Sequence, residues 1–445
     1  MPNTNGALFQ RFVEQSLNDA IKRAIDDNDI CDEDADSCRI AVTAFLSRLA
    51  YTIISNGEGT GIKVDKAREI LRNANNDDED ALYEKISLNS NLLVKNNTEE
   101  RFFHQLFQEF FASKYIQDAF EGKKSAAIFF DQTRWWIPNG WEEPAVMLVS
   151  ILYGDGKQKS WEKINQYLLW LSKTQPELTV RCIERSGIQG LSLGTLDLYT
   201  KRQIQKDLID RINGNKDRFH SKVAIGRALG RFSDIREGVG TVSSLPDIKW
   251  INVDNIRASK FPVTVEQFYS FINANDGYDY PDYWIKSNES KIWYENNKEY
   301  RTQIWNRDYH KYHSNEPVTN VSYWEAIAFC EWLSRKVGYR ITLPSECEWK
   351  QIHAFGDKGH SQWECTYSVG LNCGKSDHVS DFGLVWEWCE NEFVGLSEVV
   401  VTCMLKGGSW RYDSNYQVPE YKMLTYPFLR RNDIGFRVIS RNAQS

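Results

Sequence analysis

One stretch of the sequence, residues 316–438, contains four blocks in order: EPVTNVSYWE at 316–325, FGLVWEW at 382–388, GGSW at 407–410 and DIGFRV at 433–438. In the first block, Ser322 and Glu325 have the spacing of a capping box, in which each side chain bonds to the other's backbone amide. Apolar residues then follow at helical spacing, and Gly338 can end such a helix with a positive φ. Ser345 and Glu348 repeat the capping box. The stretch therefore predicts two helices close together.

Short apolar segments around these helices predict strands. Residues 339–343 suit a short strand, and residues 399–405 are apolar and β-branched, as in a buried strand. Residues 434–439 suit the closing strand of the domain. Between the last two segments, Gly407 and Gly408 allow a sharp turn or a close approach of two backbones.

Residues 411–433 connect these last two strands and show no clean hydrophobic period. A long segment without secondary structure in a compact domain is usually functional or disordered. Its Tyr and Arg side chains are typical anchors of interfaces, although the same rings could simply cover the core. We predict a binding surface here. Its candidate residues are Trp410, Arg411, Tyr412, Asp413, Asn415, Tyr416, Tyr421, Tyr426, Phe428, Arg430 and Arg431.

The four blocks together resemble the formylglycine-generating-enzyme-like domain, a branch of the C-type lectin fold. Residues 261–268, FPVTVEQF, are similar to the entry of that family's first helix. The resemblance implies a C-type lectin fold over residues 245–442, after a mainly helical N-terminal part, so that the fold class is α+β. In some relatives with this fold, the segment that corresponds to residues 411–433 is diversified by retroelements.

The same resemblance bears on catalysis. The formylglycine-generating enzyme is a copper oxidase that works through two cysteines after the Gly-Gly-Ser block. The alignment places Tyr412 and Gln417 at these positions, and neither supplies the thiolate that holds copper(I). Leu384 also replaces the family's asparagine before Val-Trp-Glu-Trp. We therefore expect no catalytic residues, no metal and no cofactor. His310 and His313 are expected to be solvated rather than metal ligands.

Residues 277–313 are dense in Tyr and Trp. We interpret them as an irregular insertion that packs on the core, because aromatic side chains bury large areas. A carbohydrate-stacking surface is the alternative.

Length and composition limit the number of domains, the class of partner and the compartment. A chain of 445 residues predicts two or three domains, and a net charge of −7 argues against a nucleic-acid binder. The sequence has no run of eighteen apolar residues and no N-terminal signal pattern, so we expect no membrane span and a cytoplasmic protein. Nine cysteines without a Cys-x-x-Cys motif fit a reducing compartment. Cys365 and Cys373 could pair or share a metal, but we expect free thiols.

The first part of the chain predicts helices around one hairpin. Helical periodicity covers residues 7–25, 41–54 and 103–119, and a further helix starts at residue 64. Residues 91–95 and 101–103 flank Asn96-Asn97 and predict the hairpin. This order suggests a winged-helix-like unit.

A second resemblance covers roughly the first third of the chain. RFFHQLFQEFFA at residues 101–112 and WEEPAVML at 141–148 are similar to the regulatory helical part of NACHT-type signalling NTPases. No Gly-x-x-x-x-Gly-Lys-Ser/Thr phosphate loop exists in the sequence, and GEGTG at residues 57–61 is expected to be a simple loop.

We therefore predict a winged-helix-like domain at residues 1–125, a helical bundle at 126–242, a linker at 243–246 and the lectin-like domain at 245–442, which opens with a strand at 247–251. The predicted function is a non-catalytic sensor of a prokaryotic signalling or defence system that recognises a ligand or protein partner through residues 411–433. Neither nucleic acid nor membrane is an expected partner. One alternative is a metal-dependent oxidase or sulfur-transfer enzyme. Another is a regulatory subunit that docks on a separate ATPase or effector chain through its helical part.

Overall fold

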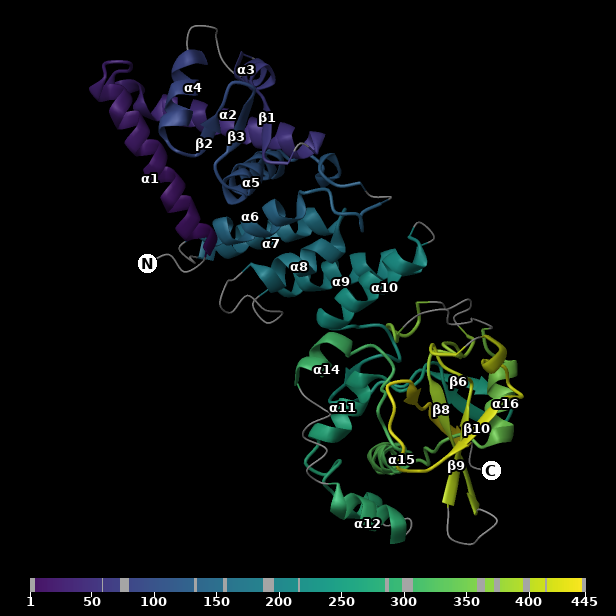
Figure 1. The fold of residues 1–445 in the computed structure, drawn as a ribbon. Helices are drawn as coiled ribbons and strands as arrows, with labels where there is room; N and C mark the ends of the chain where they lie inside the picture. Colours follow the sequence, from purple (N-terminus) through teal and green to yellow (C-terminus); the bar gives the residue numbers. More distant parts are fainter. Residues whose placement is uncertain are drawn as a thin grey trace. The chain divides into compact units, whose positions relative to one another are not determined.

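The computed structural model describes residues 5–57, 59–72, 80–131, 134–154, 158–186, 196–214, 217–284, 288–297, 307–357, 365–371, 377–394, 401–412 and 414–441. The chain divides into two compact units, Met1–Asp207 and Leu208–Ser445. An N-terminal helical region and a C-terminal part with sheets confirm the predicted mixed fold at that level (Figure 1). The boundaries predicted at residues 125 and 242 stay predictions.

Unit 1 is mainly helical. Its α2 and α5 pack against each other, and α6 contacts α1, α5, α7 and α8. By length and apolar composition, residues Asp32–Asn56 could cross a membrane, but Phe45, Leu46 and Leu49 of this segment are buried in the unit's core. The helices are α1 (Asn5–Asp26), α2 (Ala35–Asn56), α3 (Val64–Arg72), α4 (Asp80–Asn89), α5 (Gln105–Glu121), α6 (Glu142–Tyr153), α7 (Gln158–Ser172), α8 (Pro176–Arg185) and α9 (Leu198–Asn213), which extends past the unit boundary.

The predicted hairpin of unit 1 is confirmed. Strands β2 (Leu93–Lys95) and β3 (Glu99–Phe102) are antiparallel, and the Asn96 side chain accepts hydrogen bonds from the backbone amides of Thr98 and Glu99. This local bonding explains why the Asn-Asn pair forms the turn. A third strand, β1 (Gly61–Lys63), pairs with β3 and was not predicted.

Unit 2 has a group of helices, α11 to α16, between two groups of short strands. The helices are α10 (Phe219–Arg231), α11 (Val265–Asn273), α12 (Asn288–Asn296), α14 (Arg307–His313), α15 (Tyr323–Val337) and α16 (Glu346–Ala354). The strands are β4 (Thr241–Val242), β5 (Leu245–Pro246), β6 (Trp250–Val253), β7 (Ile256–Ser259), β8 (Trp386–Val394), β9 (Val401–Lys406), β10 (Lys422–Thr425), β11 (Ile434–Gly435) and β12 (Ile439–Arg441).

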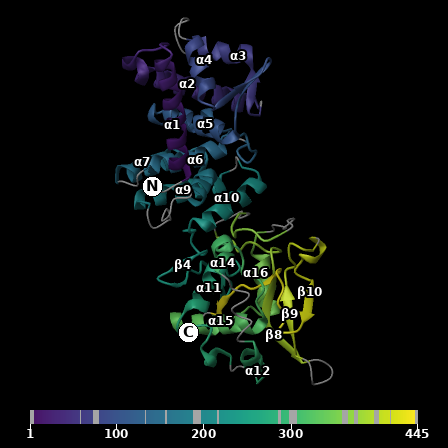
Figure 2. The same ribbon diagram turned by 60° about the vertical axis from the view of Figure 1, so that its left-hand side comes forward.

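Two main sheets organise unit 2. One has the strand order β10-β9-β8-β11, and the other has the order β12-β7-β6. Strands β8, β9 and β10 are antiparallel neighbours, and both views show them side by side (Figure 2). Strand β10 therefore forms one edge of its sheet, and it lies within the segment that carries the predicted binding residues.

The core of unit 2 is aromatic. The rings of Phe268, Phe329 and Phe436 pack together at centroid distances of 5.5 to 6.1 Å. Much of the aromatic stretch at residues 277–313 also packs inward, and Trp284 stacks on Tyr294 at 4.7 Å. The packing interpretation is therefore confirmed for the buried rings, which are Tyr278, Tyr283, Trp284 and Tyr294. The prediction that this stretch is irregular is wrong, because it contains the helices α12 and α14. Trp305 lies outside the described residues.

Four predictions about the strands and connections of unit 2 need correction. Residues 339–343 form only an isolated bridge through Thr342, and residues 434–439 are divided between β11 and β12 in different sheets. The predicted linker is the turn of the β4–β5 hairpin, in which Ser243 and Ser244 have positive φ. Residues 411–433 are not without structure, because they include β10 and a short 3-10 helix, Ser414–Tyr416.

Both predicted capping boxes are confirmed, at Ser322–Glu325 and Ser345–Glu348. A third, at Thr264–Gln267, starts α11 and was missed, because glutamine replaces the more familiar glutamate.

The end of α15 gives a first test. Gly338 has a φ of 78°, and a Cβ at this position would have no atom within 4 Å. We expect Gly338→Ala to lower the free energy of unfolding by about 1–2 kcal/mol, because only the left-handed backbone opposes the change. Gly338→Asn should cost less, since asparagine tolerates this conformation. Urea unfolding measures both, and equal stability of wild type and Gly338→Ala would contradict the assignment.

One buried ion pair joins several elements of unit 2. Arg437 Nε and Nη2 donate to the Glu387 carboxylate at 2.6 and 2.7 Å, and neither side chain is more than 1% exposed. The guanidinium also donates to the backbone carbonyls of Ser259 and Ser380, while Trp349 Nε1 donates to Glu387. This network fixes β8 to α16 and to the end of β7.

Candidate functional site

The segment that holds the predicted binding residues begins at a tight turn after β9. Gly407 and Gly408 have φ of 95° and 69°, and a Cβ on Gly408 would lie 2.7 Å from the Tyr416 carbonyl. The predicted close approach of two backbones is therefore confirmed. Ser409 Oγ then donates to Asp433 Oδ2 at 2.8 Å, so one bond joins both ends of the segment.

Arg430 holds the far end of the segment in place. Its Nε and Nη2 donate to both oxygens of Glu325 at 2.8 and 2.5 Å, and the guanidinium lies over the Trp293 ring. The Arg430 side chain is only 10% exposed and Glu325 is fully buried. Tyr278 also donates to Glu325. Arg430 was predicted as a binding residue, which stays a prediction, and these contacts show that its guanidinium is also held within the protein.

Arg431 and Arg411 are also engaged within the protein. Arg431 donates to Asp433 and, at 3.1 Å, to the Tyr412 hydroxyl. Arg411 Nη2 donates to Asn432 at 2.7 Å, and its guanidinium lies over the Trp410 ring at 5.2 Å. These two arginines and Tyr412 therefore form the base of the segment, with Arg411 at its exposed edge.

The middle of the segment presents apolar side chains to solvent. We define the aromatic strip as the large apolar side chains of this segment that are at least 38% exposed, and Tyr426 and Phe428 are 49% and 52% exposed. Their rings stack at 5.2 Å with an interplanar angle of 3°. The strip comprises Tyr416, Tyr421, Leu424, Tyr426 and Phe428.

The remaining candidate residues differ in how far they are exposed to solvent. Asn415 is exposed, whereas Trp410 is partly buried, and no described residue accepts a hydrogen bond from its buried Nε1. Asp413 lies outside the described residues. Leu424 was missed by sequence reasoning, because its exposure follows from its place on β10.

Part of unit 2 is similar to known proteins. Residues 243–378 match the sulfatase-modifying factor enzyme 1-like (FGE-sulfatase) domain. This match confirms the predicted formylglycine-generating-enzyme-like resemblance over residues 243–378 and ends before the aromatic strip begins, so the rest of the predicted range stays a prediction. The NACHT-type resemblance of the first third of the chain stays a prediction.

Two solved structures are similar to part of the chain. Treponema denticola variable protein 1 has 16% sequence identity and a TM-score of 0.27, and the match covers 46% of this chain and 91% of that one. The crystal structure of CarF has 15% identity and a TM-score of 0.29, with 46% and 96% covered. No curated protein matches the chain.

The positions that the sequence resemblance assigns to the enzyme's copper-binding thiols hold Tyr412 and Gln417, which have no thiol. The Tyr412 hydroxyl is bonded to Arg431, and its ring packs edge-on against Trp386 at 5.7 Å. Gln417 is 4% exposed, and its Nε2 donates to the carbonyls of Ser409 and Tyr412 at 3.2 and 3.1 Å. A phenol and a hydrogen-bonded amide do not fit copper(I), which prefers thiolates.

The cysteines near this segment are core residues. Cys389 and Cys403 are fully buried on β8 and β9, and burial raises the pKa of the Cys389 thiol well above its usual range. Cys365 is a free thiol, whereas Cys373 lies outside the described residues. Among the described residues, no group of three or more His, Cys, Asp or Glu side chains could hold a metal ion.

The prediction that His310 and His313 are solvated is wrong. His310 Nε2 lies 2.6 Å from a Glu266 carboxylate oxygen, and its ring stacks on Tyr269 at 3.9 Å. His313 Nδ1 lies 3.2 Å from the buried Glu316 carboxylate. Sequence reasoning missed the first pair because Glu266 lies on α11, far from His310 in the chain.

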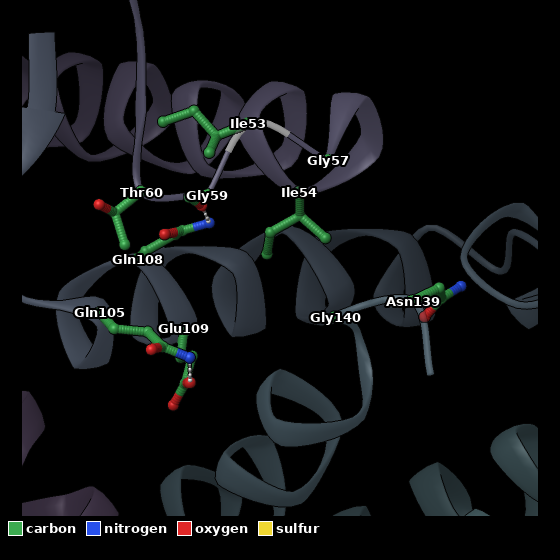
Figure 3. Close-up of a pocket in the computed structure, with 10 residues that line it drawn as sticks. All are labelled: Ile53, Ile54, Gly57, Gly59, Thr60, Gln105, Gln108, Glu109, Asn139 and Gly140. Carbon is green, nitrogen blue, oxygen red and sulfur yellow. Dashed lines mark hydrogen bonds between the residues drawn. The ribbon is translucent and has the colours of Figure 1, made fainter. Parts of the chain in front are cut away.

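A small pocket of about 270 Å³ lies in unit 1 beside residues 57–61 (Figure 3). Gln108 Nε2 donates to the Gly59 carbonyl at 3.0 Å, and Gln105 donates to Glu109 at 2.8 Å. Gly57 and Gly59 have positive φ. The predicted loop is therefore confirmed for Gly57, Gly59 and Thr60, whereas Gly61 already belongs to β1. The Gln108 side chain packs against this loop.

Proposed function

We propose that this protein is a non-catalytic sensor module that binds a ligand or a protein partner through the aromatic strip. The observation that carries the proposal is the exposure of Tyr426 and Phe428 on a segment whose two ends are fixed by buried polar contacts. Large apolar side chains held on a rigid base lose little conformational entropy on binding, which favours recognition.

The absence of catalysis is part of the proposal. It is supported by Tyr412 and Gln417, whose polar groups are bonded within the protein at the positions of the enzyme's thiols. Thiol-dependent oxygen uptake by the purified protein would contradict it.

The wider role rests on the sequence resemblances. The helices of unit 1 and its three-stranded sheet suit a winged-helix-like unit of a NACHT-type protein, and unit 2 suits a C-type lectin fold. We place the protein in the cytoplasm, in a prokaryotic signalling or defence system. Its helical part would connect recognition by the strip to a separate ATPase or effector chain.

The test compares partner capture by matched variants. We expect the double variant Tyr426→Ser/Phe428→Ser to recover its partner at least about tenfold less than wild type, because truncated interface anchors typically cost more than 1 kcal/mol each. The control is Tyr280→Ser/Tyr312→Ser, which changes exposed rings elsewhere in unit 2. The measurement is quantitative mass spectrometry of proteins and small molecules retained by each variant. Recovery of the same molecules by all three proteins would contradict the proposal.

A further inference from the structure

A second cavity lies in unit 1, between helices α1, α2 and α5. Its volume is about 390 Å³, within the range of small-molecule sites. Val13 and Leu17 of α1 and Phe110 and Phe111 of α5 are buried and form apolar walls. Ile40 of α2 is 67% exposed at the rim, which leaves the cavity open to solvent.

One lysine in this cavity has no counter-ion in contact. The Lys114 ammonium lies 5.4 Å from the centre of the Phe110 ring, and no described carboxylate lies within ion-pair distance of it. Burial lowers the pKa of Lys114, although the nearby carboxylates of Glu14, Asp118 and Glu121 oppose the shift. A ligand carboxylate would supply the missing partner.

Acceptor groups lie one turn further along the same face of α5. Gln117 and Asp118 follow Lys114 at the i+3 and i+4 positions and also line the cavity. Gln117 Nε2 donates to Glu121, but its buried Oε1 has no hydrogen-bond donor among the described residues. The carboxylates of Asp118 and Glu14 also line the cavity and are exposed to solvent, and partial burial raises the pKa of the Asp118 carboxyl. These groups suit a cation and would repel a ligand that carries only negative charge.

We propose that this cavity binds a small zwitterion with an apolar side chain, such as a branched or aromatic amino acid. The ligand carboxylate contacts Lys114, its ammonium group contacts Gln117 Oε1 and Asp118, and its side chain packs against Phe110, Phe111 and the apolar face of α1. The proposal is independent of the aromatic strip, because the cavity lies wholly within unit 1.

Calorimetry on the full chain tests this site with L-leucine and L-phenylalanine as probes. We expect saturable binding of at least one of them, and binding at least about tenfold weaker for 3-phenylpropanoate and 2-phenylethylamine, which each lack one charge. The absence of binding heat from both amino acids at about 10 mM would overturn the proposal. Equal affinity of either single-charge analogue would overturn it too.

Matched variants test whether the amino acid binds in this cavity. Lys114→Met removes the charge but keeps an unbranched side chain, and we expect it to weaken binding about 10- to 100-fold. Lys22→Met, an exposed lysine of α1 outside the cavity, is the control. Ile40→Asp changes only the exposed rim and should also weaken binding, which keeps the test valid if Lys114→Met does not fold. Binding that is unchanged in Ile40→Asp and equally weakened in both lysine variants would overturn the assignment.

Discussion

Replacement of Arg437 by leucine is expected to destabilise unit 2 by about 3–5 kcal/mol, because the change leaves the Glu387 carboxylate buried without its cation. Arg437 is 0% exposed and provides both hydrogen bonds of the pair. Its loss also leaves the carbonyls of Ser259 and Ser380 without that donor. Few single substitutions exceed this range, so Arg437→Leu should prevent stable folding of unit 2 near physiological temperature.

The measurement is urea unfolding followed by hydrogen-exchange mass spectrometry, which reports the two units separately. Arg340→Leu is the matched control, since Arg340 is 70% exposed and contacts Glu390 at 3.4 Å. Exposed pairs contribute about 0–1 kcal/mol, so this control should be nearly neutral. If both variants lost the same amount of stability, the buried pair would not have the role assigned to it.

Replacement of Asp381 by asparagine is expected to stabilise unit 2 at pH 7.5 by about 3 kcal/mol. Asp381 is buried, and burial raises its carboxyl pKa to about 6, although the Gly370 amide bonded to Oδ2 and the nearby Arg437 and Arg236 oppose the shift. The folded protein therefore favours the protonated acid. The stability that this group contributes is complete below the unfolded pKa and is lost as pH rises through about 6.

Asparagine suits this position for two reasons. Its side-chain oxygen can still accept from the Gly370 amide, and it tolerates the φ of 63° at this residue. The advantage of the variant should vanish near pH 4, where Asp381 is protonated. Asp254→Asn is the control, because Asp254 also has a positive φ but is exposed. Urea unfolding of all three proteins at both pH values tests this, and a variant less stable than wild type at pH 7.5 would contradict it.

The sequence predicted the features that depend on neighbouring residues. The capping boxes at Ser322 and Ser345 were predictable because donor and acceptor lie three residues apart. The left-handed Gly338 and the Asn96 turn were predictable for the same reason. In each case, local hydrogen bonding determines the conformation.

Features that depend on distant residues were not predictable. The ion pair of Arg430 with Glu325 was missed, because the two residues lie 105 positions apart in the chain. Strand β10 was read as irregular because Lys422–Thr425 has no clean alternation of apolar and polar residues, and its pairing with β9 defines it. Residues 434–439 were read as one strand because apolar spacing does not reveal that β11 and β12 pair with different sheets.

The bonds Ser409–Asp433 and Arg430–Glu325 have a practical consequence for protein engineering. They close the ends of the segment independently of the residues at its tip. The backbone amide of Tyr323 donates to the Pro427 carbonyl at 2.9 Å, so the backbone between the two exposed rings also belongs to the frame. Side chains exchanged at Tyr426 and Phe428 should therefore leave the frame intact, which makes this domain a candidate scaffold for libraries of side-chain variants.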